Sequence, residues 1–540
     1  MSHIIQELLF PGLELFSTEE MYVRLQGRVC VRLASRCLEF QVGGKVFLDT
    51  YFNAVSVSVW KQATTVDSLQ LKLIGRGRFL IKVGLHPGME QAHRWLMEQE
   101  VILPAGDPIR LPWDDLTGGL LYVALEALEP GEINSGFFLT EAAPAQEVRL
   151  GVVVTHFNRP AYVIPTIARL RRELIEAPSY PCNIDLFVVD NSKNLPPDQT
   201  DGATVIPNAN YGGSGGFERG LLHLIDTGNY THCLFMDDDA SCEVESIRRA
   251  YMLHRFARSR KLGVSGALLR EARPFQLHEA GGWFKDGKCR PRHHGLDMRH
   301  VHDLIQAGVA DIPVVYGAWW FFAFKISEAE KHAFPFFVRG DDILFSIANN
   351  FEIITINSVA CWGEDFSIKE NPLTRYLGLR STLALILMTS DAGRLRIFRL
   401  VLDWLIHSLL SHNYGSAEAI VEAILDVSRG PKFWCENLDA AAIREKIKPL
   451  ADSEKLYPMN IAKFDIEYRG IYESRTRRMF RLFTLNGFLL PNFLIKNKTT
   501  LNAKSSRGVF RSIFGYRHVI YYSEINKSGY VVHYDRKKFF

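Results

Sequence analysis

The chain has 540 residues, of which 47% are hydrophobic and 23% charged, and its formal net charge is +3. One hydrophobic core cannot organise this length, and at roughly 150 residues per domain we expect three or four domains. The composition is ordinary for a globular protein and excludes collagen, coiled coil and bulk disorder. The eight cysteines form no CxxC pair. We therefore expect neither a zinc site nor a disulfide framework, and a reducing cytoplasm as the compartment.

The first residues carry no basic segment and include an early acid, Glu7, so we expect no signal peptide. No apolar run reaches the ~18 residues that span a bilayer. The best candidate, residues 483–495, is broken by Asn486 and Pro491. The sequence therefore predicts a protein that is not integral to the membrane.

The near-neutral total hides an asymmetry. Residues 471–540 contain 14 Lys and Arg against 3 Asp and Glu, a net charge of +11, which leaves −8 for residues 1–470. Phe and Tyr are interleaved with these basic residues. Such a tail fits anionic lipid headgroups, nucleic acid or an acidic partner, and it equally fits a solvated rim around a packed lobe.

Residues 1–148 have the pattern of antiparallel β-structure. Segments 55–60, 69–73 and 79–83 alternate apolar and polar residues, with Gly and Pro turns between them. Regular short strands of this kind favour a β-sandwich. We therefore predict a first domain over residues 1–148, a β-sandwich like those of carbohydrate-binding domains.

Residues 149–374 change in character. Continuous apolar runs at 149–155, 186–190 and 233–237 predict strands buried on both faces, and helical segments are expected at 163–175 and 216–226. This alternation predicts an open α/β sheet, in which ligands bind at the carboxyl ends of the strands. Residues 375–540 are predicted to be mainly helical, with the basic aromatic tail at their end.

The acidic run Asp237-Asp238-Asp239 directly follows one of these strands. Because successive strand residues face opposite ways, we expect Asp237 and Asp239 on one side and Asp238 on the other. Two carboxylates on one side suit a hard divalent cation that neutralises a diphosphate. A solvated acidic turn is the alternative interpretation.

A glycine-rich segment, residues 210–220, opens the helix before that strand. Backbone N–H groups of such a segment can approach a phosphate closely, and Arg219 can add a charge-assisted hydrogen bond. The segment matches neither a P-loop nor a Rossmann fingerprint. A flexible loop is the alternative.

Polar residues also follow the other two strands, namely Thr155, Asn158 and Arg159 after the first and Asp190 after the second. A carboxylate in such a position can bind a ribose or a base edge, and capping of the next helix is the alternative.

A second acidic pair, Asp341 and Asp342, precedes a predicted helix. One Asp is explained by N-capping, and the other can act as a general base toward a sugar hydroxyl. The preceding Trp319 and Trp320 suit a saccharide-stacking wall, although one of them is expected in the core. Glu364 and Asp365 follow a later strand, where either can complete a metal shell.

Together these motifs, in this order, resemble family 2 glycosyltransferases, and most closely the polymerising galactofuranosyltransferases of bacterial cell-surface glycans. The resemblance covers about residues 1–390. It implies a β-sandwich, a central GT-A (Rossmann-like) nucleotide-sugar domain and a helical C-terminal region.

The resemblance also implies roles for individual residues. Mn²⁺ or Mg²⁺ would be held by Asp237 and Asp239, and the donor sugar or ribose by Asp238. Uridine would be held by Thr155, Arg159 and Asp190, and the donor pocket would be shaped by the 210–219 segment, which includes Asn210, Gly213 and Arg219. The acceptor hydroxyl would be deprotonated by Asp342, which Asp341 orients, in an acceptor groove shaped by Trp319 and Trp320.

One departure from the family pattern concerns the metal. The family has Trp-His where this chain has Trp362-Gly363, and Gly363 cannot be a ligand. Glu364 or Asp365 takes over, water fills the position, or the metal site is weakened or lost.

The resulting hypothesis is an inverting, metal-dependent transfer of galactofuranose from UDP-galactofuranose to a lipid-linked glycan acceptor, at the cytoplasmic face of the inner membrane and held there by the basic tail. Two alternatives stay open: another donor, such as dTDP-rhamnose, and a glycan-binding assembly subunit. No nucleic-acid partner is expected, because the basic region has no recognised nucleic-acid-binding signature. The oligomeric state is open, with a homo-oligomer as one option.

Overall fold

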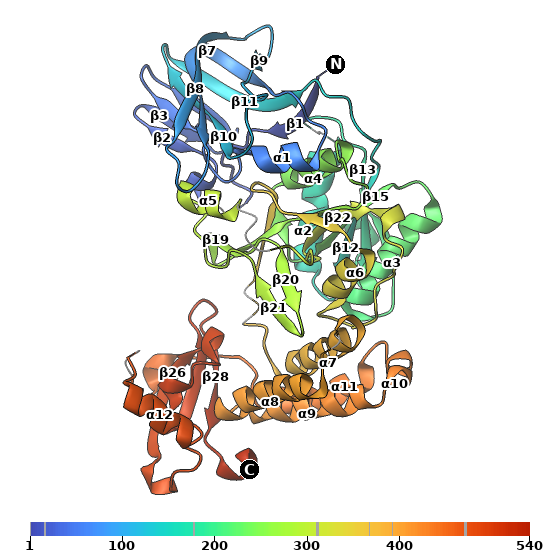
Figure 1. Cartoon of the computed structure of the whole chain (residues 1–540), viewed down its shortest axis with the longest axis vertical. Helices are drawn as coiled ribbons and strands as arrows, with labels where there is room; N and C mark the ends of the chain where they lie inside the picture. Colours follow the sequence, from blue (N-terminus) through green and yellow to red (C-terminus); the bar gives the residue numbers. More distant parts are fainter. Residues whose placement is uncertain are drawn as a thin grey trace. The chain divides into compact units, whose positions relative to one another are not determined.

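The computed structural model describes residues 2–15, 18–176, 179–308, 313–364, 366, 368–390, 392–468 and 472–540 (Figure 1). The chain is a mixed α/β multidomain protein, as the sequence predicted. Its contacts divide it into two compact units. The first comprises Met1–Phe284, Lys288–Phe334 and Asp342–Gly363, and the second comprises Lys285–Gly287, Pro335–Asp341 and Glu364–Phe540.

The first unit begins with an antiparallel β region built around one long strand, β7 (Gln70–His86). The first half of β7 pairs with β11 (Gly131–Thr140), and its second half pairs with β10 (Leu120–Ala127) and β8 (Arg94–Leu103). The remaining elements of this region are β1 (His3–Glu7), β2 (Arg24–Gln26), β3 (Val29–Arg32), β4 (Cys37–Phe40), β5 (Lys45–Phe47), β6 (Val55–Ser56), β9 (Ile109–Arg110) and the short helix α1 (Val57–Ala63). In β7 the side chains of Phe79, Ile81, Val83 and Leu85 are buried, which confirms the predicted alternation there.

The chain's N-terminal strand is tied to a distant helix, α4 (Val244–Arg255). The backbone N–H of Glu7 donates to Oε1 of Glu245 at 2.7 Å, and Nη2 of Arg249 donates to the Glu7 carbonyl at 2.7 Å. Arg249 also donates to the carbonyl of Phe52 at 2.8 Å. The side chains of Glu245 and Arg249 are fully buried and pair with each other. Burying these charges is tolerable only because both halves of the contact are present.

The centre of the first unit is a seven-stranded sheet in the order β14-β13-β12-β15-β22-β17-β23. Its strands are β12 (Leu150–His156), β13 (Ile184–Asp190), β14 (Thr204–Pro207), β15 (His232–Asp237), β17 (Leu262–Ser265), β22 (Phe321–Lys325) and β23 (Glu352–Ile354). The first four strands in this order are parallel, which confirms the predicted α/β sheet. A second sheet, in the order β16-β24-β18-β19, consists of β16 (Ser241–Cys242), β18 (Ala267–Arg270), β19 (Arg273–Glu279) and β24 (Ala360–Gly363). The unit also contains the hairpin β20 (Gly282–Lys285) and β21 (Lys288–Pro291) and the helix α5 (Val301–Ala307).

Helices cover both faces of the seven-stranded sheet. Val153 packs with helix α3 (Gly212–Thr227) and with α6 (Asp341–Asn349), in a cluster that includes Phe217 and Phe345. Val152 and Val154 point the other way, into the core shared with α2 (Pro160–Leu170) and α4. Burial on both faces explains why this strand is a continuous apolar run.

Among its described residues from 364 onward, the second unit has first five helices and then a sheet. The helices are α7 (Pro372–Thr389), α8 (Arg394–Leu410), α9 (Tyr414–Ser428), α10 (Pro431–Glu436) and α11 (Ala441–Asp452). They are followed by a four-stranded sheet in the order β25-β28-β27-β26, made of β25 (Tyr457–Pro458), β26 (Lys496–Ala503), β27 (Tyr516–Ser523) and β28 (Ser528–His533). Three short helices accompany it: α12 (Arg475–Phe483), α13 (Phe510–Ile513) and α14 (Arg536–Phe539). Residues 372–452 are mainly helical, as predicted. The sheet that follows them was not predicted. None of the helices in the described ranges is long and apolar enough to cross a bilayer.

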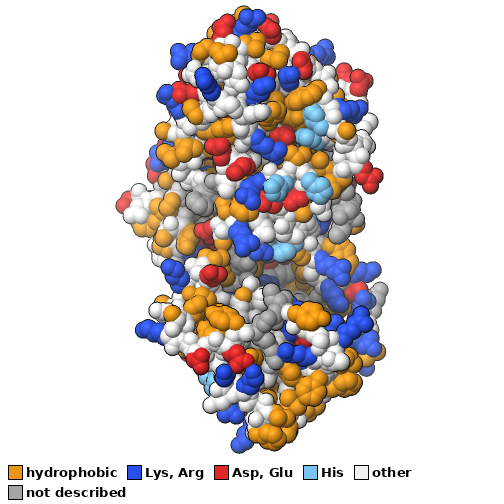
Figure 2. All heavy atoms as spheres, turned by 90° about the vertical axis from the view of Figure 1, so that its left-hand side faces the viewer, with side chains coloured by type: hydrophobic (Ala, Val, Ile, Leu, Met, Phe, Trp, Pro, Cys, Tyr) orange, Lys and Arg blue, Asp and Glu red, His pale blue; other side chains and the backbone are white. Residues whose placement is uncertain are grey.

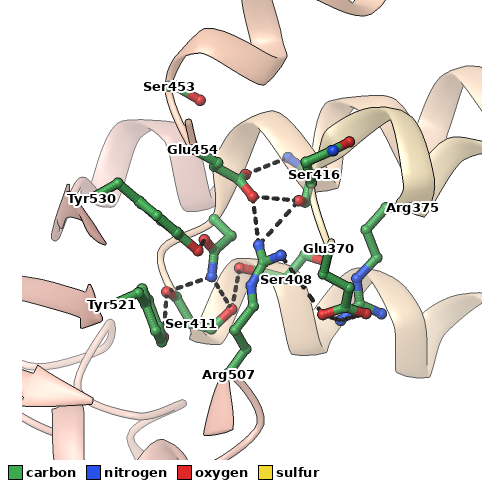
Figure 3. A network of polar contacts seen from close by, with 12 residues as sticks. Glu370, Arg375, Ser408, Ser411, Ser416, Ser453, Glu454, Arg507, Tyr521 and Tyr530 are labelled. Atoms are coloured by element: carbon green, nitrogen blue, oxygen red, sulfur yellow. Dashed lines mark hydrogen bonds and ion pairs between the residues drawn. The ribbon is translucent and has the colours of Figure 1, made fainter. Parts of the chain in front are cut away.

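A buried network of charges holds the second unit together (Figure 3). Both oxygens of Glu454 accept hydrogen bonds from Ser416, and Glu454 is paired with Arg507. The side chains of Glu454 and Arg507 are only 1% and 5% exposed. Arg507 also lies 3.7 Å from Glu370, whose carbonyl accepts a hydrogen bond of 2.6 Å from Lys504. This network connects the start of α7 and the helix α9 to the segment between β26 and β27.

Candidate active site

Three of the predicted motifs meet at one edge of the seven-stranded sheet. Thr155 at the end of β12 is in register with Asp237 at the end of β15, and the neighbouring His156 is in register with Asp190 at the end of β13. The carboxyl ends of parallel strands in an open α/β sheet are the usual place for a ligand. The structure thus brings together the residues that the sequence analysis placed there.

The acidic run makes specific ion pairs. Nδ1 of His156 lies 3.3 Å from Oδ2 of Asp238, and Nη1 of Arg159 lies 3.5 Å from Oδ1 of Asp238. Arg159 also donates a short hydrogen bond to Asp239. The expectation that Asp238 faces away from Asp239 is therefore wrong: both contact Arg159. The strand ends at Asp237, so strict alternation does not extend into the following turn.

These pairs set the protonation of the site. Burial alone would lower the pKa of His156, but its hydrogen bonds to Asp238 and Asn194 and the nearby negative charges raise that pKa above the ordinary value. Burial also disfavours the charge of Arg159, and the three carboxylates outweigh it and raise its pKa. The edge is therefore an acid–base cluster in which three carboxylates face Arg159 and the basic imidazole of His156.

The fit of a divalent cation can be judged from these contacts. Carboxylates are the right ligand chemistry for Mg²⁺ or Mn²⁺, and Asp237 is half-buried at the end of its strand. Asp239, however, is engaged by Arg159. Within the described ranges no three His, Cys, Asp or Glu side chains are grouped as a metal site. The carboxylates of Asp237 and Asp239 are thus suitable ligands for a divalent cation. The described ranges do not supply a third ligand beside them.

The predicted third ligand has an ion pair of its own. Glu364 belongs to the second unit, where its carboxylate lies 3.6 Å from Nζ of Lys369. Asp365 lies outside the described residues. Gly363 ends β24, and a Cβ at its position would lie 3.0 Å from a methyl group of Leu268. A larger side chain at Gly363 would therefore need Leu268 to move.

Asp190 organises a loop in this structure. Its two carboxylate oxygens accept five hydrogen bonds from residues 192–195, four of them from backbone N–H groups. Burial would raise the pKa of Asp190, and these bonds outweigh it and lower the pKa below the ordinary value. The carboxylate is thus a fixed anion that shapes the loop beside His156, and its contact with uridine stays a prediction.

The glycine-rich segment lets α3 pack directly on β12. A Cβ on Gly216 would lie 2.3 Å from Cγ2 of Thr155, and one on Gly220 would lie 2.2 Å from Cγ1 of Val153. Both distances exclude any side chain. Gly213 differs, because a Cβ there would meet nothing within 4 Å. Some of these glycines are therefore required for packing, and Gly213 is free to face a ligand.

Other donor-site residues have modest roles in this structure. Oδ1 of Asn210 accepts a hydrogen bond of 3.1 Å from the N–H of Gly212 and so fixes the start of α3. Arg219 is half-buried on α3. Oγ1 of Thr155 is buried and has no hydrogen-bond partner among the described residues. An unsatisfied buried hydroxyl is costly, so Thr155 is a candidate to bind a ligand atom.

The two tryptophans separate. Trp319 is a core residue, packed edge-on against Phe217, Phe235 and Phe345. Trp320 is half-buried, and its indole N–H donates to the carbonyl of Gly266 at 3.0 Å. The expectation that both shape an acceptor groove therefore needs correction: in this structure only Trp320 presents any surface.

The second acidic pair begins α6 at Asp341. The backbone N–H of Ile343 donates to Oδ1 of Asp342 at 2.8 Å, and α6 packs on the sheet through Phe345 and Phe235. The negative charge of Asp342, after burial and Glu279, helps to raise the pKa of Tyr316. Asp342 therefore belongs to the same unit as the acidic run, on a helix that packs against the same sheet.

Sequence reasoning missed His156 and Glu279 as parts of the polar framework. His156 directly follows Thr155, so its position at the end of a buried strand was a usable signal. Glu279 is buried, and burial raises its pKa to about 7 against an opposing hydrogen bond from Tyr316. Nothing in its local sequence indicates this.

Comparison with known proteins bears on the enzyme class. The chain is 25% identical over 444 residues to the galactofuranosyltransferase GlfT2 of Mycobacterium tuberculosis, a match that covers 75% of this chain and 68% of that protein. It is 24% identical over 447 residues to GlfT2 of Mycolicibacterium smegmatis, covering 75% and 67%. The predicted resemblance is confirmed. The predicted enzyme class, a glycosyltransferase, is confirmed with it.

The other comparisons add little. No protein-family model matches the chain. Among solved structures, GalNAc-T7 with UDP, GalNAc and Mn²⁺ shares 9% identity and a TM-score of 0.30, over 41% of this chain and 44% of that one. The glycosyltransferase assignment therefore rests on the sequence similarity.

Proposed function

We propose that this protein transfers galactofuranose from UDP-galactofuranose to a hydroxyl group of a cell-surface glycan, with inversion at the anomeric carbon. The observation that carries the proposal is the similarity to galactofuranosyltransferases over three quarters of the chain. The placement of Thr155, Asp190 and Asp237 at one sheet edge supports it.

The chemistry follows from single displacement. The acceptor oxygen forms a bond to the anomeric carbon as the bond from that carbon to the diphosphate oxygen breaks, and the hydroxyl proton passes to a carboxylate. We assign that carboxylate to Asp342, with Asp341 orienting it. Uridine would be bound by Thr155, Arg159 and the loop ordered by Asp190, and Trp320 would line the acceptor side.

Charge on the departing diphosphate needs a counter-charge. Arg159 is already at the site and can supply part of it. A bound Mn²⁺ or Mg²⁺ would supply Lewis-acid stabilisation of the leaving group, held by Asp237 and Asp239 after Arg159 has left Asp239. Asp238, paired with His156, is left to bind the donor sugar or ribose.

We further propose that the second unit holds the enzyme against an anionic membrane. From residue 474 to 494 the chain has four arginines and no acidic residue. In α12 the apolar side chains of Met479, Phe480, Leu482 and Phe483 are all exposed, and α12 buries none of its residues. Leu489 and Phe493 extend this apolar stretch, and Phe493 is 84% exposed. We call these six apolar residues, with Arg475 and Arg478, the basic apolar surface. At the lower end of the view in Figure 2, hydrophobic side chains lie beside Lys and Arg.

The composition of this surface favours lipid. A helix with exposed Phe and Leu on one side and Arg on the other lies in the headgroup region with its apolar side buried. A surface of this kind would bring the enzyme to the membrane that holds a lipid-linked acceptor, as a peripheral protein at the cytoplasmic face of the inner membrane.

The transfer reaction can be tested directly. We expect that the protein incubated with UDP-galactofuranose, a synthetic glycan acceptor and Mn²⁺ adds the mass of one or more hexoses, as read by mass spectrometry. A panel with dTDP-rhamnose and UDP-galactopyranose identifies the donor. Transfer from dTDP-rhamnose alone would replace the donor assignment, and glycan binding without any transfer would favour an assembly subunit.

Membrane association has its own test. Sedimentation with vesicles of phosphatidylglycerol should capture the protein, and vesicles of phosphatidylcholine should capture less. The double variant Phe480→Ser/Phe483→Ser should lose binding, whereas Ile525→Ser, which alters an equally exposed apolar residue of the same unit, should not. Equal capture of both variants would contradict this assignment.

A further inference from the structure

The β region of the first unit carries an aromatic cluster that the transfer reaction does not use. On β7, the side chains of Val83 and Leu85 face the core, so Lys82, Gly84 and His86 face outward. Gly84 is paired with Tyr122 of β10 on one side and with Trp95 of β8 on the other. Figure 2 looks onto the side of the molecule that carries β2 and β3, and its upper half shows histidine side chains among hydrophobic ones.

Two local features place Trp95 on this outer face. The pairing of β7 with β8 shifts register between Val83 and Gly84, so that Val83 pairs with Met97 and Gly84 with Trp95, which leaves Leu96 as a bulge. Bulges re-aim side chains. A Cβ on Gly84 would lie 2.5 Å from the ring of Tyr122, so a glycine is needed for that ring to lie across it. Trp95 is 42% exposed.

The rings around Trp95 form a rigid base. The centroid of Trp95 is 5.8 Å from Tyr122 and 4.7 Å from His93. His86 stacks on Tyr122 at 5.0 Å. The hydroxyl of Tyr122 is 2.6 Å from Nε2 of His93, so both polar groups are fixed. The exposed indole is therefore held in place before any ligand binds, which lowers the entropy cost of binding.

Polar groups lie beside this base with hydrogen-bonding capacity left over. Nε2 of His86 is 3.2 Å from Oδ2 of Asp49, and Nη1 of Arg24 is 3.2 Å from the same oxygen. Oδ1 of Asp49 is buried and has no hydrogen-bond partner among the described residues. Burial, followed by the neighbouring His86, lowers the pKa of His93 below its ordinary value and so favours the neutral imidazole. The described part of the chain contains no group of three His, Cys, Asp or Glu side chains placed to hold a metal ion.

We infer that this cluster is a carbohydrate-binding site, which we call the Trp95 site. A sugar ring offers an apolar C–H face and a rim of hydroxyls; the Trp95 indole suits the first, and Asp49, His86, His93 and Arg24 suit the second. A single exposed ring is too small for a protein interface, which needs roughly 800 Å² on each partner. The Trp95 site rests on the proposed function only for the choice of glycan. If the protein transfers galactofuranose, the ligand would be the galactofuranose chain already present on the acceptor.

Donor-free binding tests the Trp95 site. Calorimetric titration of the full chain with a galactofuranose hexasaccharide should give saturable binding, with a galactopyranose hexasaccharide as comparator. Trp95→Ala should weaken binding about tenfold, as expected for loss of a stacked ring. Trp95→Phe should retain most of the affinity, and Ile102→Ala, an exposed apolar change on the same strand, should have no effect. Asp49→Asn should weaken binding independently of the ring, and thermal melting checks that each variant is folded.

The outcomes separate this inference from the proposed function. Wild-type affinity in Trp95→Ala, or no saturable binding of either hexasaccharide by the wild type, would overturn the Trp95 site even if the enzyme transfers sugar. Trp95-dependent binding by a protein that transfers nothing would support the site and refute the proposed function. In an active enzyme, Trp95→Ala should raise KM for long acceptors and leave kcat for a disaccharide acceptor unchanged.

Discussion

Two clusters of charge, one in each unit, show how burial decides what an ion pair can do. At the end of β15, Asp238 and Asp239 share Arg159, whose side chain is 39% exposed. In the second unit, Glu454 and Arg507 are almost completely buried, and Ser416 occupies the remaining acceptor positions of Glu454. An exposed partner can leave when a ligand arrives, whereas a buried one cannot leave without stranding a charge. We therefore assign binding and catalysis to the first unit's cluster and stability to the second's.

The largest effect is expected from the proposed base. Asp342→Asn should lower kcat by about 10²–10⁴, the range for loss of a general base, with no change in melting temperature. The matched control is Asp226→Asn, which alters an exposed carboxylate on α3 of the same unit. Steady-state kinetics with UDP-galactofuranose measures both. A rate near that of the wild type would remove Asp342 from the mechanism.

A substitution in the buried cluster of the second unit should instead lower stability. Glu454→Ala leaves Arg507 without its main partner and should destabilise the second unit by about 3–5 kcal/mol, measured by urea unfolding. The control Glu422→Ala breaks a more exposed pair with Lys446 and should cost less than about 1 kcal/mol. Equal losses in the free energy of unfolding for the two variants would contradict a stabilising role that depends on burial of the pair.

Measurements of cation binding show whether a metal ion can replace Arg159 as the partner of Asp239. Mn²⁺ with UDP should raise the melting temperature of the wild type, corresponding to about 2.7 kcal/mol at a hundredfold excess over Kd. Asp237→Ala should abolish the rise, and Arg159→Ala should strengthen Mn²⁺ binding measured without nucleotide, because Asp239 is then released. An unchanged shift in Asp237→Ala would contradict the metal assignment.

The smallest effect expected is on the pH dependence of stability, which should have opposite signs in the two units. Burial raises the pKa of Glu279 from 4.5 to about 7, so the first unit should lose stability as the pH rises from about 4.5 to 7. Burial and Arg507 lower the pKa of Lys504 from 10.5 to about 7, so the second unit should gain stability as the pH rises from about 7 to 10.5. Each change should be on the order of 1–3 kcal/mol.

Hydrogen exchange resolved by unit measures these slopes. Glu279→Gln should flatten the acid slope of the first unit only, and Lys504→Met the alkaline slope of the second only. Slopes of the same sign in both units would show that other groups dominate the titration.

Much of the seven-stranded sheet could be predicted from sequence because its parallel strands are buried on both faces. Strands β12, β13 and β15 are continuous apolar runs and were located to within a few residues. The sheet edge that collects Thr155, Asp190 and Asp237 follows from parallel strands alone. The C-terminal sheet was missed because local periodicity does not identify its pairings: β26 and β27 pair in parallel, and β25 pairs with β28, which lies far along the chain.

Partners far apart in sequence were the other limit. The pairing of Arg159 with Asp239 joins residues 80 positions apart, and no spacing rule indicates it. The assignment of Trp319 to the core depends on Phe345, which belongs to a later helix. The glycines of residues 210–220 are a further example. The sequence indicates a phosphate-binding segment, but Gly216 and Gly220 are needed for α3 to pack on β12.

The contact between the first strand and α4 has a consequence for how the chain is made. The backbone N–H of Glu7 donates to Glu245, and its carbonyl accepts from Arg249. During synthesis the N-terminal β region emerges long before its partners, so β1 must wait until about half of the chain has left the ribosome. A fragment that ends at the predicted boundary near residue 148 would lack that partner helix altogether. The β region is first in the sequence but cannot be the first part to be finished.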